Sequence, residues 1–286
     1  MNAHVSSCPT RPLLRYLGGK WRLAPKITPY LPPHALYVEP FGGSAAVLAH
    51  KPRCNSEIWN DVDGELVNLF RILRDEAAAR HLVDLVALTP YARAEHELSY
   101  EVAGEPIERA RRLLVRSHMG HGNNGTSQHL SVGWRIDGVT NTNDVAGQWA
   151  HFPDALEQWI SRLRGVQIEQ RSALELISKF SVSNALLYLD PPYVPETRSA
   201  SVRWTTGKCA YAHDMTLADH EVLLEQVLRS PAMIVLSGYA SDLYDDALQG
   251  WRRVTFAARA HGNKPRTEVL WINRAAQDAS GGLFIE

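Results

Sequence analysis

Residues 185–193 have the sequence ALLYLDPPY, and this stretch decides the fold. Its first five residues are apolar and stand shortly before two prolines, which is typical of a buried strand of an α/β sheet. The tetrapeptide Asp190-Pro191-Pro192-Tyr193 then falls at the carboxyl end of that strand. Open α/β sheets bind their ligands at this edge, so we expect the tetrapeptide to lie in a binding site.

The chemistry of these four residues suits the activation of an exocyclic amine of a nucleobase. The lone pair of such an amine is delocalised into the ring, so the amine is a poor nucleophile. A carboxylate oxygen of Asp190 and the carbonyl of Pro191 can accept its two N–H groups and free the lone pair. Pro192 stiffens the turn, and Tyr193 offers a face on which an extruded base can stack. The competing interpretation is an ordinary proline turn with a capping aspartate.

A second candidate site lies upstream, where residues 35–38 predict a strand and residues 45–49 a helix. Between them the sequence EPFGGS (residues 39–44) carries paired glycines, which let the backbone pass close to a ligand. A further strand over residues 56–60 ends at Asp61, and an acidic group about 20 residues past a glycine turn is the usual acceptor for ribose hydroxyls. The glycine spacing is neither G-x-G-x-x-G nor a P-loop. The implied ligand has a ribose and an adenine but no pyrophosphate, as S-adenosylmethionine does.

Four segments together resemble the Dam-type DNA adenine-N6 methyltransferases, most closely those of phages and prophages. They are LLRYLGGK (residues 13–20), VEPFGGS (38–44), Asn60-Asp61 and DPPY (190–193), and the likeness resumes over 233–239 and 266–271. The order, with the cofactor loop before DPPY, is that of the α-group. The resemblance implies an α/β fold: a Rossmann-like, S-adenosylmethionine-dependent methyltransferase sheet with a smaller, mainly helical target-recognition insert.

The resemblance also implies the site residues. The catalytic motif is Asp190, Pro191, Pro192 and Tyr193. The residues expected to bind the cofactor S-adenosylmethionine are Tyr16, Lys20, Glu39, Pro40, Phe41, Gly42, Gly43, Ser44, Asp61, Ser172 and Asp190. Ser172 is a departure, because the family usually has an acidic residue there that accepts from the adenine amine. Ser172 can still form a hydrogen bond, and Glu175 follows one helical turn later.

A chain of 286 residues can bury a substantial core. We expect a catalytic domain over residues 13–73 and 165–275, an inserted target-recognition subdomain over 74–164, and flexible ends over 1–12 and 276–286. Asp61 is expected to start a helix that continues through residue 73. Thr216, with Asp219 three residues later, predicts a capping box at the start of another helix.

Candidate DNA contacts come from two polar segments. A basic stretch over residues 109–116 leads into a region rich in Gly, Asn, His, Ser and Thr, and a second basic segment (194–210) follows DPPY. Arg binds phosphates or reads guanine, and Asn reads adenine. The alternatives are a solvated helix face paired with Glu105 and Glu108, and a plain surface loop instead of a flap that closes over the base. The predicted DNA-binding residues are Arg109, Arg112, Arg116, His118, Asn123, Asn124, Arg135, Arg198, Arg203 and Lys208.

The composition limits which partners and which cellular compartment we expect for the protein. A net charge of −1 argues against indiscriminate coating of nucleic acid, so a basic surface must be local. The three cysteines, Cys8, Cys54 and Cys209, are too scattered for a disulfide framework or a zinc site, which fits a reducing cytoplasm. We expect no metal, no signal peptide, no membrane span and a monomer.

The predicted function is site-specific DNA methylation. A methyl group is transferred from S-adenosylmethionine to N6 of an adenine that is flipped out of double-stranded DNA. The nearest alternative is N4-cytosine methylation, although that family more often has Ser in place of Asp190. A NAD-dependent oxidoreductase could use the Gly42-Gly43 turn, but it leaves DPPY unexplained. A catalytically idle DNA-binding regulator is a third class, against which Lys20, Asp61 and Asp190 argue.

Overall fold

The computed structural model of the chain describes residues 8–122, 125–126, 131–137, 143–194, 214–259 and 265–281. Tertiary packing divides the chain into two compact units. The helical unit combines Met1–Gly19 with Asp63–Gly165, and the sheet unit combines Lys20–Val62 with Val166–Glu286. Residues 63–73 fall in the helical unit, in contrast to the expected division, because α3 (Gly64–Ile72) packs against α6 (Pro106–Met119).

The sheet unit is built on seven strands in the order β3-β2-β1-β4-β5-β7-β6. The first five in this order are parallel to one another, and β7 is antiparallel to both of its neighbours. The strands predicted over residues 35–38, 56–60 and 185–189 are present as β1, β2 and β4. The bounds are β1 Leu36–Glu39, β2 Ser56–Asn60, β3 Val166–Glu169, β4 Ala185–Leu189, β5 Met233–Tyr239, β6 Arg252–Arg259 and β7 Pro265–Ile272.

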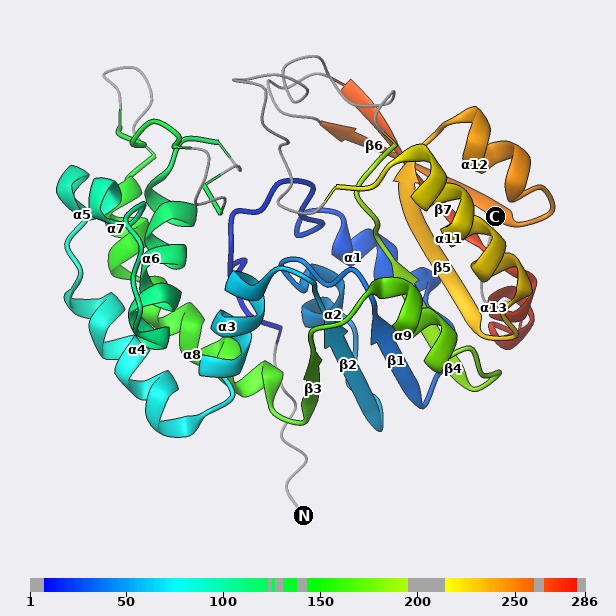
Figure 1. The fold of residues 1–286 in the computed structure, drawn as a ribbon, viewed down its shortest axis with the longest axis horizontal. Helices are drawn as coiled ribbons and strands as arrows, with labels where there is room; N and C mark the ends of the chain where they lie inside the picture. Colours follow the sequence, from blue (N-terminus) through cyan, green and yellow to red (C-terminus); the bar gives the residue numbers. More distant parts are fainter. Residues whose placement is uncertain are drawn as a thin grey trace. The chain divides into compact units, whose positions relative to one another are not determined.

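The strand order reverses between β1 and β4. From β1 the chain adds β2 and β3 on one side, and it then returns to add β4 and β5 on the other (Figure 1). Doubly wound sheets bind ligands in the crevice beyond the carboxyl ends of the strands at such a switch point. We therefore expect ligands to bind at the loops that follow β1 and β4.

All five residues of β4 are buried, which explains why the sequence shows a continuous apolar run there and no alternation. Helices α9 (Ala173–Lys179) and α11 (Leu217–Arg229) lie over one face of the sheet (Figure 1). The predicted capping box of α11, between Thr216 and Asp219, is present. The unit is completed by α1 Ala24–Ile27, the 3-10 helix η1 Thr28–Tyr30, α2 Ala46–His50, α12 Asp242–Ala247 and α13 Arg274–Ala279.

The helical unit contains six helices within the described residues. Helix α3 begins at Gly64 and not at Asp61 as expected, because the side chain of Asp63 accepts the N–H of Glu65 at 2.8 Å and caps the helix. Besides α3 and α6, the helices are α4 Glu76–Leu88, α5 Arg93–Leu98, α7 Val145–Ala150 and α8 Phe152–Leu163.

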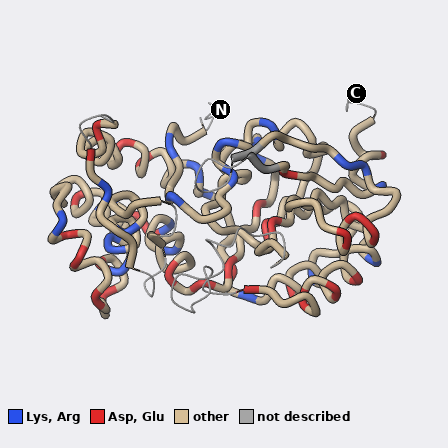
Figure 2. Tube along the Cα trace, turned by 90° about the horizontal axis from the view of Figure 1, so that it is seen from above, with Lys and Arg blue, Asp and Glu red and all other residues tan. Residues whose placement is uncertain are grey.

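Charged residues are distributed over both units. Figure 2 shows Lys and Arg positions interleaved with Asp and Glu positions along the Cα trace, in keeping with the net charge of −1. In the described part of the chain, no helix combines the length and the apolar character needed to cross a membrane.

Candidate active site

The sheet brings the two sequence motifs together. Strands β1 and β4 are parallel neighbours, with Val38 paired to Leu187. The glycine turn follows Glu39 at the end of β1, and Asp190 follows Leu189 at the end of β4. Both loops therefore leave the sheet at the same edge, at the switch point described above.

Asp190 is held by a cation and a hydroxyl group. Lys20 Nζ lies 2.7 Å from Asp190 Oδ1 and 2.8 Å from Oδ2, and Ser237 of β5 donates to Oδ1 at 3.0 Å. The side chain of Lys20 is 4% exposed and that of Asp190 is 19% exposed. Charge-assisted hydrogen bonds of this length are among the stronger ones in proteins. The carboxylate is thus fixed in orientation while one side of it remains open to solvent.

The hydroxyl group of Tyr188 forms a hydrogen bond with that of Ser237. Tyr188 Oη lies 3.0 Å from Ser237 Oγ, and both residues are buried. Ser237 has one hydroxyl proton and gives it to Asp190, so the proton between the two hydroxyls comes from Tyr188. Burial and the nearby Asp190 raise the pKa of Tyr188 well above its ordinary value, which keeps this phenol protonated as a donor.

Tyr193 is oriented by Lys20 and by Glu268 of β7. Lys20 Nζ donates to Tyr193 Oη at 2.5 Å, and the Tyr193 hydroxyl donates to Glu268 Oε1. Glu268 also lies 3.3 Å from Lys20 Nζ. Burial raises the pKa of Glu268, and the charge of Lys20 acts in the opposite direction. One lysine therefore connects Asp190, Tyr193 and Glu268 in a single buried network.

The ring of Tyr193 is largely enclosed. It is 9% exposed, its centroid lies 4.3 Å from that of Tyr239, and Lys20 Nζ lies 4.8 Å from it. In this structure Tyr193 is a hydrogen-bonding centre. The predicted stacking of a base on Tyr193 would require one of its faces to become accessible.

The glycine turn after β1 needs both of its glycines. Gly43 has a φ of +47°, and its N–H donates to Asp61 Oδ2 at 2.9 Å. A Cβ at Gly42 would lie 2.1 Å from Nε1 of Trp59, well inside van der Waals contact. Ala45 also takes a positive φ, of 54°, immediately before α2. The turn is thus tied directly to Asp61, the predicted acceptor for ribose hydroxyls.

Glu39 forms internal hydrogen bonds in this structure. It is 2% exposed and accepts from Tyr37 Oη at 2.6 Å and from the N–H of Leu48 at 2.7 Å through the same oxygen, Oε1. These contacts fasten the end of β1 to α2. A direct cofactor contact by Glu39, as predicted, would have to coexist with this structural role.

Asn60 joins the loops that follow β1 and β3. Its amide nitrogen donates to the carbonyls of Pro40 and Arg171, at 2.8 and 3.0 Å, and its oxygen accepts the N–H of Arg171 at 2.9 Å. Ser172 follows Arg171 at the N-terminus of α9 and is exposed. Ser172 is therefore held at the same edge of the sheet as the glycine turn and Asp61.

Tyr16 belongs to the helical unit, whereas the other residues predicted to bind the cofactor belong to the sheet unit. It is half-buried, and its carbonyl accepts the N–H of Gly19 at 3.1 Å. This turn leads directly into Lys20.

The basic stretch of α6 is largely paired within the helical unit. Arg109 Nε donates to Glu65 at 3.0 Å, and Arg112 Nε donates to Glu108 at 2.7 Å. Arg116 is 1% exposed, and its guanidinium donates to the carbonyl of Ser99. This buried position argues against a base contact by Arg116, because reading a base edge needs a side chain that projects into a groove.

His118 faces inward as well. Its Nε2 lies 3.0 Å from the carbonyl of Leu13, and its ring centroid lies 4.1 Å from that of Phe152. Burial lowers the pKa of His118 to about 4. The ring is therefore neutral at physiological pH, which does not favour the predicted contact with DNA phosphates.

Arg135 and Arg15 form a basic pair. Burial lowers the pKa of Arg15, and the nearby charge of Arg135 lowers it further. Arg15 Nη1 donates to the carbonyl of Gly120 at 3.3 Å, and the N–H of Arg135 donates to the carbonyl of Met119 at 2.7 Å. Two neighbouring guanidinium groups attract an anion more strongly than either does alone. Of the predicted DNA contacts, Asn123, Asn124, Arg198, Arg203 and Lys208 lie outside the described residues.

Sequence reasoning did not include Glu268, Ser237, Asn60 or Arg15 among the site residues. Ser237 follows the apolar run MIVL of β5, and Glu268 directly precedes the apolar run VLWI of β7. A polar residue at the end of a buried run is costly unless it has a partner, and this is the signal that could have identified both.

Comparison with known proteins bears on the same residues. Residues 16–105 match the family described as D12 class N6 adenine-specific DNA methyltransferase. The matched segment includes Tyr16, Lys20, the glycine turn and Asp61, and it ends before Asp190.

Three bacterial proteins show the likeness over longer stretches. A DNA adenine methylase of Serratia marcescens is 24% identical over 246 residues, which cover 84% of this chain and 87% of the relative. A DNA adenine methylase of Haemophilus influenzae is 23% identical over 218 residues, or 73% of each chain. A DNA adenine methylase of Escherichia coli K12 is 26% identical over 199 residues, or 67% of this chain and 68% of the relative.

Proposed function

We infer that the chain is an N6-adenine DNA methyltransferase of the D12 class, and we propose that it modifies an adenine flipped out of double-stranded DNA. The family match and the three relatives support the reaction class. The observation that carries the mechanism is the position of Asp190, which Lys20 and Ser237 hold at the switch-point edge of the sheet.

The loops after β1, β2 and β3 fit S-adenosylmethionine as the cofactor. Gly43 adopts a left-handed backbone, and the carboxylate of Asp61 lies beside it, which offers an acceptor for ribose hydroxyls. Ser44, Ser172 and Tyr16 are the further residues that we propose to hold this group. When bound, S-adenosylmethionine supplies an electrophilic methyl group.

Asp190 and Pro191 are proposed to hold the target amine. A carboxylate oxygen of Asp190 and the carbonyl of Pro191 each accept one N–H of the adenine N6. Two such acceptors favour a tetrahedral nitrogen whose lone pair points at the methyl group. The negative charge of Asp190 also stabilises the positive charge that develops on N6 as the new bond forms. No covalent bond between protein and base is needed.

The surrounding network keeps these acceptors in place. Lys20 contacts both oxygens of Asp190, while Tyr188 supports the donor Ser237. Glu268 accepts the hydrogen bond of the Tyr193 hydroxyl and forms a second ion pair with Lys20. Groups that are oriented before the substrate arrives need little reorganisation during the reaction, and most of the rate enhancement is expected from such positioning.

The DNA contact is proposed to involve the basic pair of Arg15 and Arg135, which would bind backbone phosphates. The finer parts of the proposal are a phage or prophage origin, a cytoplasmic setting and a monomeric state. These rest on the sequence patterns described above.

The proposed function is tested by measuring how much methyl group the variant Asp190→Ala transfers to DNA. Tritiated S-adenosylmethionine and duplex DNA should give base-labelled DNA with the wild type and with the control Asp84→Ala, which changes an exposed residue of α4. Asp190→Ala should show a loss of about 100- to 1000-fold, as expected when a group that stabilises the transition state is removed, with little change in DNA affinity. N6-methyladenine as the product supports the proposal, whereas N4-methylcytosine or near-normal turnover by Asp190→Ala overturns it.

A further inference from the structure

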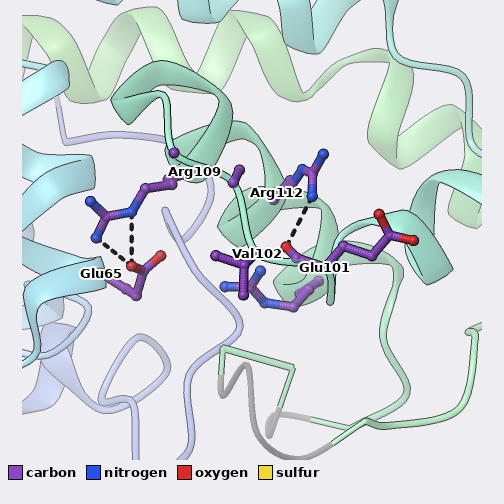
Figure 3. Close-up of a pocket in the computed structure, with 8 residues that line it drawn as sticks. Glu65, Glu101, Val102, Arg109 and Arg112 are labelled. Atoms are coloured by element: carbon purple, nitrogen blue, oxygen red, sulfur yellow. Dashed lines mark hydrogen bonds and ion pairs between the residues drawn. The ribbon is translucent and has the colours of Figure 1, made fainter.

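A pocket of the helical unit is lined by three arginines from one face of α6. Its volume is about 330 Å³. Arg109, Arg112 and Arg116 are spaced three and four residues apart, so they project from the same side of the helix. The other walls are Glu65 of α3 and the turn over residues 101–104 (Figure 3). This pocket has no part in the chemistry described above.

Two of the three arginines have carboxylate partners. Arg109 faces the carboxylate of Glu65, and Arg112 donates to the carbonyl of Glu101 at 2.9 Å (Figure 3). Arg112 also binds Glu108 at 2.7 Å. The carboxylate of Glu101 extends away from Arg109 and Glu65 (Figure 3). Glu65 is therefore the carboxylate that faces the arginines across the pocket.

Arg116 differs from the other two. Its guanidinium has one hydrogen bond, to the neutral carbonyl of Ser99, and the Tyr100 ring lies 6.0 Å away. Within the part of the chain that the structure describes, neither Nε nor Nη2 of Arg116 has a hydrogen-bond partner. Burial lowers the pKa of Arg116, while Glu65 acts against this at longer range. A buried charge without a bonded anion is costly, so the fold retains it at a price in stability.

We propose that this pocket binds a phosphate group, with Nε and Nη2 of Arg116 as donors. The planar fork of a guanidinium matches an oxyanion in a bidentate manner, better than a lysine does. Arg109 and Arg112 line the same pocket, each already paired with a carboxylate, so Arg116 is the arginine of this face left to bind the anion. Val102, 89% exposed, gives an apolar surface beside it, against which a sugar can pack. The phosphate can belong to the DNA backbone, which rests on the proposed function, or to a free phosphate compound.

The first arm of the test uses inorganic phosphate without DNA. The full chain is titrated with phosphate at constant ionic strength, while the melting temperature and the heat of binding are followed. Wild type should be stabilised progressively, as expected for a ligand of the native state. Arg116→Met should lose about tenfold or more in phosphate affinity. The matched control is Arg162→Met, a residue of α8 that is also 1% exposed but does not line the pocket, and its phosphate response should equal that of wild type.

The second arm identifies the source of the phosphate. If the site takes a DNA phosphate, Arg116→Met should weaken duplex binding evenly across sequences and reduce the slope of log affinity against log salt by about 0.9. A phosphate response with unchanged DNA binding would support a free phosphate compound. Equal phosphate response and equal DNA binding in wild type and Arg116→Met would overturn the proposal.

If Arg116→Met does not fold, the variant Arg116→Lys provides the test. This variant keeps the charge but lacks the fork, so its phosphate response should be weaker than that of wild type, and a full response would contradict the proposal. Methylation by the wild type is measured separately. Failure of the proposed function therefore leaves the phosphate arm interpretable.

Discussion

Replacing Lys20 by methionine tests the network that surrounds Asp190. Lys20 is 4% exposed, and its Nζ lies 2.7 Å from Asp190 and 3.3 Å from Glu268. Removing one partner of a buried ion pair typically costs about 3–5 kcal/mol, because it leaves an uncompensated charge. The Asp190 side chain is 19% exposed, so water can compensate part of its charge. We therefore expect the free energy of unfolding to fall by about 3 kcal/mol, at the lower end of this range.

A double-mutant cycle with Glu268→Gln identifies the carboxylate responsible. Without Lys20, the hydrogen bond from Tyr193 still lowers the pKa of Glu268, but the charge that acts most strongly against its burial is gone. Glu268→Gln removes that charge, so the variant Lys20→Met/Glu268→Gln should be more stable than the sum of the two single changes predicts. Contacting groups in one network commonly show coupling free energies of about 0.5–3 kcal/mol.

Urea denaturation at pH 7.5 and at pH 5.5 provides the measurement. A carboxyl group whose pKa is raised on folding still holds its proton at pH values where the unfolded chain has lost it, so stability rises as the pH falls through that window. Lys20→Met should therefore regain stability relative to wild type at the lower pH, and the double variant should not. Additive free energies together with a penalty independent of pH would refute the reasoning.

Two further predictions concern Asp61 and His118. Asp61→Ala should weaken S-adenosylmethionine binding by about one to two decades, since charge-assisted hydrogen bonds contribute roughly 1.5–3 kcal/mol, and calorimetry showing unchanged affinity would contradict the ribose assignment. The pKa of His118 is lowered to about 4, so the unfolded chain takes up a proton below about pH 6.5 that the native state refuses. Stability should therefore decrease between these pH values, by at most about 3 kcal/mol. The decrease should be smaller in His118→Gln, and equal urea-unfolding profiles for the two proteins would count against it.

The centre of the sheet could be predicted because β4 and β5 are buried on both faces. Apolar runs such as residues 185–189 and 233–236 need no partner to be recognised, and turn residues mark their ends. Asp190 and the glycine turn could be placed at one edge for the same reason, since parallel strands share their carboxyl ends.

What could not be predicted depends on partners that are distant in the sequence. Arg109 pairs with Glu65, 44 residues away, and Tyr193 pairs with Glu268, 75 residues away. A basic helix has the same composition whether its arginines face solvent or internal carboxylates. The sequence of α6 therefore could not reveal that Arg116, a predicted DNA contact, is only 1% exposed.

The position of β7 affects when the site can assemble during synthesis. This strand lies between β5 and β6, although it follows both in the chain, and it carries Glu268. A nascent chain that has reached residue 259 has the glycine turn, Asp61 and Asp190, but β5 is paired only with β4, and β6 lacks β7, the strand that it pairs with. Tyr193 and Lys20 then lack Glu268 as a partner. We therefore expect unfinished chains to be poorly organised for methyl transfer, because the strand that completes the network emerges from the ribosome after every other strand of the sheet.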